Sequence, residues 1–300
     1  MKISFLKYSK IFVGIAIILS LASIICLVLF GLNLGIDFSG GSIIEINFEK
    51  RPENQEIEKK LRELELKEFI LQPAGQNGLT VKTQEIDDLT YQKIISKLNE
   101  LSKVEEIGFE SIGPTISREL VQKAIILIII AFVALLIYIT IAFSKISGAI
   151  SGWQYGLISI LTLFFDILIT LGVISTLGRF LNFQFNIPIV TALLTILGYT
   201  INDKVIVFDR VRENLRKESG SPLMLLIDKS LNQVFLRSIS TGTCTLLILA
   251  SIFILGEETL KYFALTLITV IIIGTLSSLF LANPILFYWL NFRQKLQSRT

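Results

Sequence analysis

Six long apolar stretches dominate the chain, and polar segments separate them. Each stretch approaches or exceeds the ~20 residues that an α-helix needs to cross the hydrocarbon core of a bilayer. The first is too long for the apolar region of a signal peptide and lacks a clear cleavage site, so we expect an uncleaved anchor. The pattern therefore predicts six transmembrane helices, near Ile11–Leu32, Leu120–Phe143, Tyr155–Leu177, Ile187–Phe208, Val234–Leu255 and Tyr262–Leu290.

Between the first two apolar stretches lies one polar segment of domain size, from Asn33 to Arg118. Apolar and polar residues alternate in Gly41–Phe48, as in a half-buried strand. Helical spacing of apolar residues follows Pro52 and recurs from Asp87 to Leu101. The order β-α-β-β-α-β predicts an α+β ferredoxin-like module, which identifies a fold and no function. The remaining strands are expected at Phe69–Leu71, Leu79–Thr83 and Val104–Ile112.

Lysine and arginine residues in the short connections predict the orientation of the chain, because such residues are enriched on the cytoplasmic side. The N-terminus and alternate loops are basic, whereas the opposite short connections hold only Arg179 and Lys261. We therefore expect both ends to be cytoplasmic and residues 33–118 to lie outside. The predicted parts are residues 1–32 (N-terminus and first span), 33–118 (periplasmic domain), 119–290 (spans two to six) and 291–300 (tail). The basic residues on the predicted cytoplasmic side include Lys145, Arg210, Arg212, Arg216, Lys217, Lys229, Arg293, Lys295 and Arg299.

Composition narrows the chemistry that is available. Charged residues make up 18% of the chain and hydrophobic residues 52%, with a mean hydropathy of +0.68, which disfavours a water-soluble protein. The net charge of +3 indicates no nucleic-acid partner. With no histidine and two cysteines inside apolar stretches, we expect no catalytic triad, no metal cluster and no bound cofactor. Any proton transfer must use carboxylates.

Ionisable residues within the predicted spans are candidates for function, because burying a charge in a membrane is costly. Asp203 in the fourth span and Arg237 in the fifth lie one to two turns from the same interface, so an ion pair between neighbouring helices is geometrically reasonable. Desolvation favours the neutral carboxyl, whereas a nearby guanidinium favours the carboxylate. The pair is therefore either a proton relay, which we favour, or a static ion pair that fixes helix register.

Two further charged residues lie in these spans. Asp166, in the third span, has no basic partner in its own helix, and a second relay carboxylate and a hydrogen-bonded packing residue are equally good interpretations. Lys204 follows Asp203 directly. We interpret it as a solvated charge near the helix end, whose side chain extends towards the interface.

Two glycine-containing segments flank the polar domain. Gly35–Gly41 is a weak match to a phosphate-binding loop, because it lacks the Gly-Lys-Ser/Thr ending. Gly40 and Gly41 are better explained by a tight bend where the chain leaves the membrane. Gly113 and Pro114 form a similar bend before the second span. These two joints are either hinges or rigid corners.

Three segments together resemble the SecD/SecF family of protein-export membrane proteins, within the resistance-nodulation-division superfamily. They are LNLGIDFSGG (Leu32–Gly41), SIGPTISREL (Ser111–Leu120) and GYTINDKVIVFDRVREN (Gly198–Asn214), the last typical of the SecF branch. FDILITLG (Phe165–Gly172) resembles a further family segment. In this family the position of Phe165 is commonly a histidine and that of Lys204 a small polar residue. The side chains that would set the proton affinity of a relay carboxylate therefore differ in this chain.

The resemblance implies a six-span, non-enzymatic subunit of the bacterial inner membrane that works with SecD beside the SecYEG channel and YajC on a translocating preprotein. It also implies that Asp203 is the family's intramembrane aspartate and Arg237 its functional arginine, in a subunit that couples the proton gradient to export. Two alternatives remain. A structural scaffold of the translocase would tolerate Asp203→Asn, and a small-molecule exporter half would need a larger outer domain.

Overall fold

The computed structural model describes residues 3–64, 66, 69–144, 151–218 and 220–297. Lys145 and Arg299, which were used to predict orientation, lie outside the described residues. The chain forms two compact units. The helical unit consists of Met1–Asn33 and Ile126–Thr300, and the sheet unit of Leu34–Ile125.

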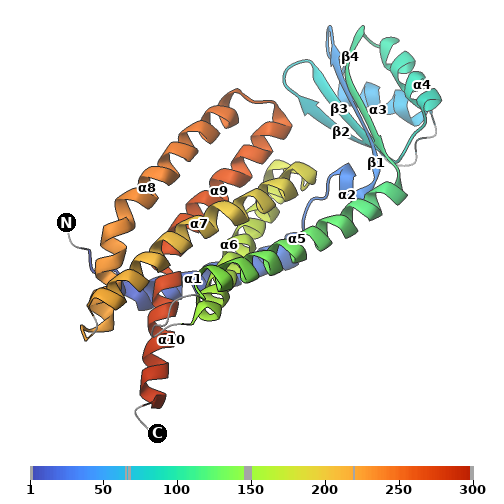
Figure 1. The fold of residues 1–300 in the computed structure, drawn as a ribbon. Coiled ribbons are helices and arrows are strands. Elements are labelled where there is room, and N and C mark those ends of the chain that lie inside the picture. Colours follow the sequence, from blue (N-terminus) through green and yellow to red (C-terminus); the bar gives the residue numbers. More distant parts are fainter. Residues whose placement is uncertain (1–2, 65, 67–68, 145–150, 219, 298–300) are drawn as a thin grey trace. The chain divides into compact units, whose positions relative to one another are not determined.

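Within the described residues, six helical stretches are long and apolar enough to cross a membrane, as the hydropathy pattern predicts. The last stretch is made of two helices that meet at Leu281, close to Pro284, which has no N–H to donate within a helix. In chain order the elements are η1 (Leu6–Tyr8), α1 (Ser9–Phe30), α5 (Pro114–Ala142), α6 (Gly152–Leu181), α7 (Ile187–Lys217), α8 (Leu223–Leu255), α9 (Glu258–Phe280) and α10 (Ala282–Gln297) (Figure 1).

Two of these helices extend beyond the predicted spans. The prediction ended the fourth span at Phe208, where continuous apolar sequence stops, but α7 continues to Lys217. The fifth span begins at Leu223, before the predicted Val234. Asn214 joins the two extensions by donating to Ser230 Oγ at 2.8 Å and to Gln233 Oε1 at 2.9 Å. The extended ends therefore form one hydrogen-bonded helical hairpin.

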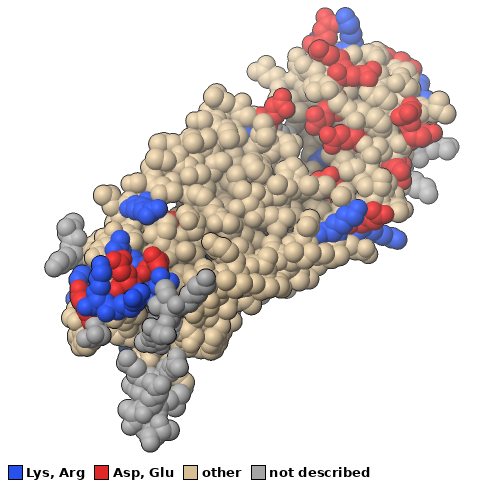
Figure 2. All heavy atoms as spheres, viewed as in Figure 1, with Lys and Arg blue, Asp and Glu red and all other residues tan. Residues whose placement is uncertain are grey.

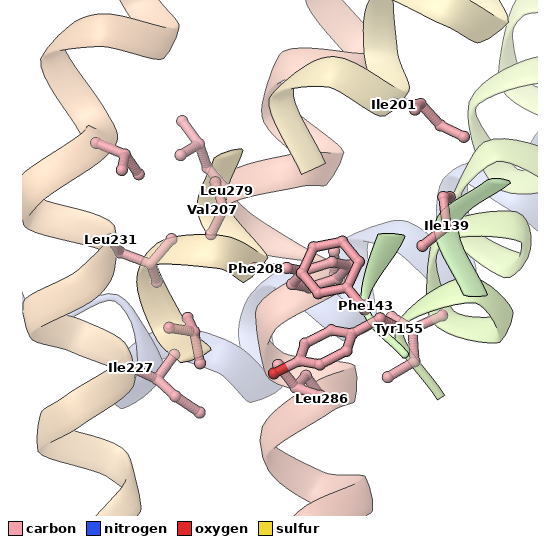
Figure 3. Close-up of a cluster of buried hydrophobic side chains, with 14 of the residues drawn as sticks. Ile139, Phe143, Tyr155, Ile201, Val207, Phe208, Ile227, Leu231, Leu279 and Leu286 are labelled. Atoms are coloured by element: carbon pink, nitrogen blue, oxygen red, sulfur yellow. The ribbon is translucent and has the colours of Figure 1, made fainter. Parts of the chain in front are cut away.

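The interior of the helical unit is formed by α6, α7 and α9, which contact one another. One hydrophobic cluster brings residues from α5, α6, α7, α8 and the last span together, with Tyr155 and Phe208 ring centroids 5.2 Å apart (Figure 3). A second cluster includes Ile174, Ile189 and Val270. By contrast, α1 and α5 leave most of their apolar side chains exposed, and few residues of α8 are buried, as expected of surfaces that face lipid or another membrane protein.

Charged side chains of the helical unit gather at the end that holds the α7–α8 connection, beside a broad uncharged face (Figure 2). This charged end includes ion pairs of Glu213 with Arg210 and Lys217, both 2.7 Å long, and a pair between Glu218 and Lys229. The distribution is that of an apolar surface bounded by a polar interface.

The sheet unit contains four antiparallel strands in the order β2-β3-β1-β4. Apolar residues of β1 and β3 pack against two helices in one core, which contains Ile44, Val81, Ile57 and Leu98. This arrangement confirms the predicted ferredoxin-like fold, and two strands have the predicted bounds. The elements are α2 (Ile36–Ser39), β1 (Gly41–Phe48), α3 (Asn54–Arg62), β2 (Phe69–Ala74), β3 (Gly78–Thr83), α4 (Asp88–Asn99) and β4 (Val104–Ile112).

Candidate functional site

A buried ion pair lies inside the helical unit, between α6 and α7. Lys204 Nζ is 2.6 Å from Asp166 Oδ2, and the two side chains are 0% and 1% exposed. The prediction that Lys204 is a solvated charge near the helix end is therefore wrong. Asp166 does have a basic partner, which comes from the neighbouring helix. At this distance the contact is a charge-assisted hydrogen bond.

Depth along the helices explains this pairing. Asp166 lies about four turns after the start of α6, and Lys204 about four turns before the end of α7. Because α6 and α7 are consecutive and antiparallel, both side chains come to the same level of the unit. The same reasoning from depth, applied to Lys204 in the sequence, would have identified Asp166 as a partner.

The surroundings of the pair are tightly packed and rich in hydroxyl groups. Thr170 donates to the Asp166 carbonyl at 2.8 Å, and Thr200 donates to the Ile196 carbonyl at 2.9 Å, so both hydroxyls are satisfied within their own helices. From α9, Ser277 lies beside the Asp166 carboxyl and donates to the Gly274 carbonyl at 3.2 Å. Asp166 Oδ1 is buried and has no hydrogen-bond partner among the described residues.

Asp203 is also buried, with 3% of its surface exposed. No ion pair within 4.0 Å joins it to Arg237, although the structure describes both residues, and the Arg237 side chain is exposed on α8. The charges of Lys204 and Arg237 nevertheless both act on the Asp203 carboxylate. The site thus contains one carboxylate with a close ammonium partner, Asp166, and one without an ion-pair partner, Asp203.

The two predicted joints both belong to the sheet unit. Gly40 and Gly41 have φ angles of 74° and 125°, in the region that favours glycine, and Gly41 begins β1. Pro114 is the first residue of α5, where a missing N–H costs nothing, and the Gly113 carbonyl accepts from Ser117 N at 3.0 Å. The positive φ angles thus account for glycine at positions 40 and 41, and the start of α5 accounts for proline at position 114.

No group of three or more histidine, cysteine, aspartate or glutamate side chains that could hold a metal ion occurs among the described residues. The charged groups at the buried site are the carboxylates of Asp166 and Asp203 and their cationic neighbours.

Comparison with known proteins gives matches along the chain. The family described as "Protein export membrane protein SecD/SecF, C-terminal" matches residues 91–292, and the "SecD/SecF GG Motif" matches residues 27–50, a range that includes Gly40 and Gly41. The protein translocase subunit SecF of Sebaldella termitidis is 38% identical over 88% of this chain and 84% of that protein. The subunit of the same name from Thermobaculum terrenum is 32% identical over 96% of this chain and 94% of that protein.

Solved structures give the same result for the fold. SecDF of Thermus thermophilus, a translocon-associated membrane protein, is 28% identical with a TM-score of 0.85, over 97% of this chain and 39% of that chain. A second structure, SecDF in a super-membrane-facing form, has a TM-score of 0.71 at 25% identity, over all of this chain and 40% of that one. This chain thus spans about two fifths of the solved chains. The family resemblance seen in the sequence is confirmed.

Proposed function

Because this chain belongs to the SecD/SecF family of protein-export membrane proteins, we propose that it is the SecF subunit of a Sec translocase. It would work with SecD, beside the SecYEG channel and YajC, on a preprotein that is crossing the membrane. The solved SecDF chains carry a further segment beyond the part that matches this chain. The family transports proteins and is not a family of enzymes.

We further propose that this subunit couples the proton gradient to export through Asp203. The observation that carries this proposal is a carboxylate that is buried among membrane-spanning helices without an ion-pair partner. Such a group is costly when it is ionised and readily takes up a proton. Arg237, on the next helix, is close enough for its charge to act on the same carboxylate.

The proposed cycle uses this sensitivity. Loss of the proton from Asp203 increases its attraction to Arg237 and draws α7 and α8 together, and protonation releases them. The movement would pass along the chain through Gly40–Gly41 and Gly113–Pro114 to the sheet unit, which holds or releases the emerging preprotein. One proton moving through ~100 mV supplies about 2.3 kcal/mol, so the movement per proton is expected to be small.

We place the α7–α8 connection and both chain ends in the cytoplasm of a bacterium, with the sheet unit outside the inner membrane. Arg210, Lys217 and Lys229, at the charged end of the helical unit, support this orientation, because basic residues are enriched on the cytoplasmic side.

The test is preprotein export into inverted membrane vesicles that contain this chain with SecD, with and without a proton gradient. Asp203→Asn is expected to lose the gradient-dependent part of export, a decrease of up to roughly 50-fold, since about 2.3 kcal/mol is no longer used. Asp209→Asn is the matched control, because it makes the same change on α7 at an exposed residue that pairs with Arg212 at 3.0 Å.

Two alternatives have distinct outcomes in this assay. A scaffold role predicts full gradient-dependent export in Asp203→Asn with normal SecD association, and that result would overturn the proposal. A small-molecule exporter predicts proton movement without a preprotein. The sheet unit is one compact ferredoxin-like module, which disfavours the exporter because an exporter half would need a larger outer domain.

A further inference from the structure

The buried charges of α6 and α7 do not balance. Asp166 and Asp203 contribute two carboxylates, 1% and 3% exposed, whereas Lys204 contributes one ammonium that is 0% exposed. Arg237 is exposed on α8 and makes no ion pair with either carboxylate. Since an uncompensated buried charge is strongly unfavourable, one of the two carboxylates should be neutral when the site is closed.

The contacts show which carboxylate Lys204 compensates. Its ammonium lies 2.6 Å from Asp166 Oδ2, whereas it makes no such contact with Asp203, its neighbour in sequence. Successive residues of a helix point in different directions, so Lys204 acts on Asp203 through its charge without a hydrogen bond. Lys204 is therefore committed to Asp166 by the geometry of α7.

Among the described residues, Lys204 is the charged side chain found at the Asp166 carboxyl. The helices in contact with α6 include α1, α5, α7, α9 and α10. The charged residues of α5, from Arg118 to Lys123, lie in its first turns, whereas its contact with α6 lies near its other end, at Phe143. Lys10 is the charged residue of α1, and α9 carries Glu258 and Lys261 in its first turns only, while the basic residues of α10 follow Phe292. At the carboxylate itself, α9 contributes Ser277 and Gly274.

Packing holds the pair in place. A Cβ atom built on Gly274 would overlap Thr200 Cγ2 and would lie 3.8 Å from Asp166 Oδ2, so α9 is pressed against the pair. The Ser277 hydroxyl can rotate towards the free Oδ1 atom, which would supply the donor that a carboxylate in this position needs. Separating the two charges in this space would leave both without solvent.

We propose that Lys204 is a built-in counter-ion that keeps Asp166 ionised throughout the transport cycle, so that Asp203 is the only carboxylate of this cluster that exchanges protons. Lys204 is thus a positioning residue: it sets the number of exchangeable protons at the site at one. The pairing rests on the geometry, and only the use of the proton for export rests on the proposed function.

Infrared difference spectroscopy of the chain in lipid vesicles with SecD tests this directly, because a buried carboxyl gives a C=O stretching band that disappears when it loses its proton. The wild type minus Asp203→Asn difference should contain one titrating band. The Asp166→Asn variant should keep a titrating band that Asp166→Asn/Asp203→Asn lacks. Lys204→Met should gain a band that Asp166→Asn/Lys204→Met lacks, since Asp166 must then take up a proton to become neutral. A titrating band that depends on Asp166 in the presence of Lys204 would overturn the proposal.

Export provides an independent measurement. Lys204→Met and Asp166→Asn each leave one buried group without its partner, and each is expected to lower export or assembly roughly tenfold or more. The double variant removes both charges and should recover to within about threefold of wild type, since a buried ion pair can often be replaced by neutral side chains. A double variant as defective as Asp166→Asn would overturn the proposal.

These outcomes separate the two proposals. If Asp203→Asn loses its infrared band but keeps gradient-dependent export, the proposed coupling function fails and the counter-ion role of Lys204 stands. If Asp203→Asn loses export while a band that depends on Asp166 also titrates, the coupling function stands and the counter-ion role fails.

Discussion

Gly274 of α9 lies directly against Thr200 of α7, in a space that a methyl group could not share. Thr200 precedes Lys204 by about one helical turn, so this contact closes α9 over the Asp166–Lys204 pair. Small residues at membrane helix interfaces allow such close approach of the backbones. The absence of a side chain at Gly274 is thus a structural condition for the buried site.

Gly274→Ala is expected to destabilise the helical unit, because the added methyl group must displace Thr200 or push α9 outward. Overpacking of this kind costs about 1–3 kcal/mol. The measurement is the midpoint of thermal unfolding of the full chain in detergent. Gly198→Ala is the control, since a Cβ there would meet no atom within 4 Å. Equal midpoints for the two variants would show that α9 has room to adjust.

A second relationship ties the N-terminal segment to α8. Ile3 N donates to Asn232 Oδ1 at 2.8 Å, and Asn232 Nδ2 donates back to the Ile3 carbonyl at 2.7 Å. One turn earlier, Asp228 Oδ1 accepts from Leu6 N at 2.9 Å. The side chains of α8 thus satisfy backbone groups that no regular element satisfies.

Asn232→Ala should release this segment, because it removes both hydrogen bonds of Ile3, which together contribute roughly 2 kcal/mol. Hydrogen exchange of the N-terminal peptide, followed by mass spectrometry, should become about tenfold faster or more. Lys229→Ala, on the same helix and with an exposed ion pair to Glu218, should leave the exchange unchanged. Unchanged exchange in Asn232→Ala would mean that burial of Phe5 alone holds the segment.

The sequence predicts the elements well where one physical rule decides them. Membrane crossing demands continuous apolar residues, so hydropathy identified all six spans. Alternation identified β1 with its observed bounds, and the closing strand predicted at Val104–Ile112 is β4. The predicted strand Phe69–Leu71 is shorter than β2, which continues through Pro73 to Ala74. A proline is tolerated there because β2 lies at the edge of the sheet.

The site is predicted less well, because depth along a helix says nothing about rotation around its axis. Depth placed Asp203 and Arg237 at similar levels, and the structure leaves them without an ion pair. Lys204 was assigned to solvent because a lysine near a helix end commonly extends outward. That rule fails here because α7 is in the interior, with helices on several sides, so the Lys204 side chain meets Asp166 before it can reach an interface.

At Gly41 the backbone itself restricts the residue type. Its φ is 125°, and a Cβ would lie 2.6 Å from the Thr83 carbonyl oxygen. Gly41→Ala should therefore disrupt the start of β1 and its pairing with β3, at a cost well above the ~1 kcal/mol of a positive φ alone. Hydrogen exchange of the β1 and β3 peptides in the full chain measures the effect.

Gly75→Ala separates the cost of a positive φ from the cost of the contact between an added Cβ and Thr83. Gly75 has a φ of 67° but no atom within 4 Å of an added Cβ, so the variant bears only the cost of the backbone conformation. It should accelerate exchange less than Gly41→Ala does. Equal effects would mean that contact with Thr83 contributes little.

The pH dependence of the sheet unit should depend in part on Asp87, which caps α4 and accepts from Thr90 N at 3.0 Å. Hydrogen bonds from the hydroxyl and the backbone N–H of Thr90 hold the pKa of Asp87 below its ordinary value of 3.8. The folded state therefore binds this proton less tightly than the unfolded chain does. The stabilisation by the cap is complete above pH 3.8 and is lost as the pH falls through the lower pKa of the folded state.

Asp87→Ala should consequently accelerate hydrogen exchange in α4 at about pH 7. The difference from wild type should shrink as the pH falls below 3.8 and the wild-type carboxyl takes up its proton. Each comparison is made at one pH, so the intrinsic pH dependence of exchange cancels. Asp88→Ala changes a neighbouring carboxylate that does not receive the Thr90 bond, and it should show a smaller difference at about pH 7. If the Asp87→Ala difference did not shrink in acid, the protonated side chain of Asp87 would still cap α4 without its negative charge. The neutral side-chain oxygen of asparagine caps other helices in this way.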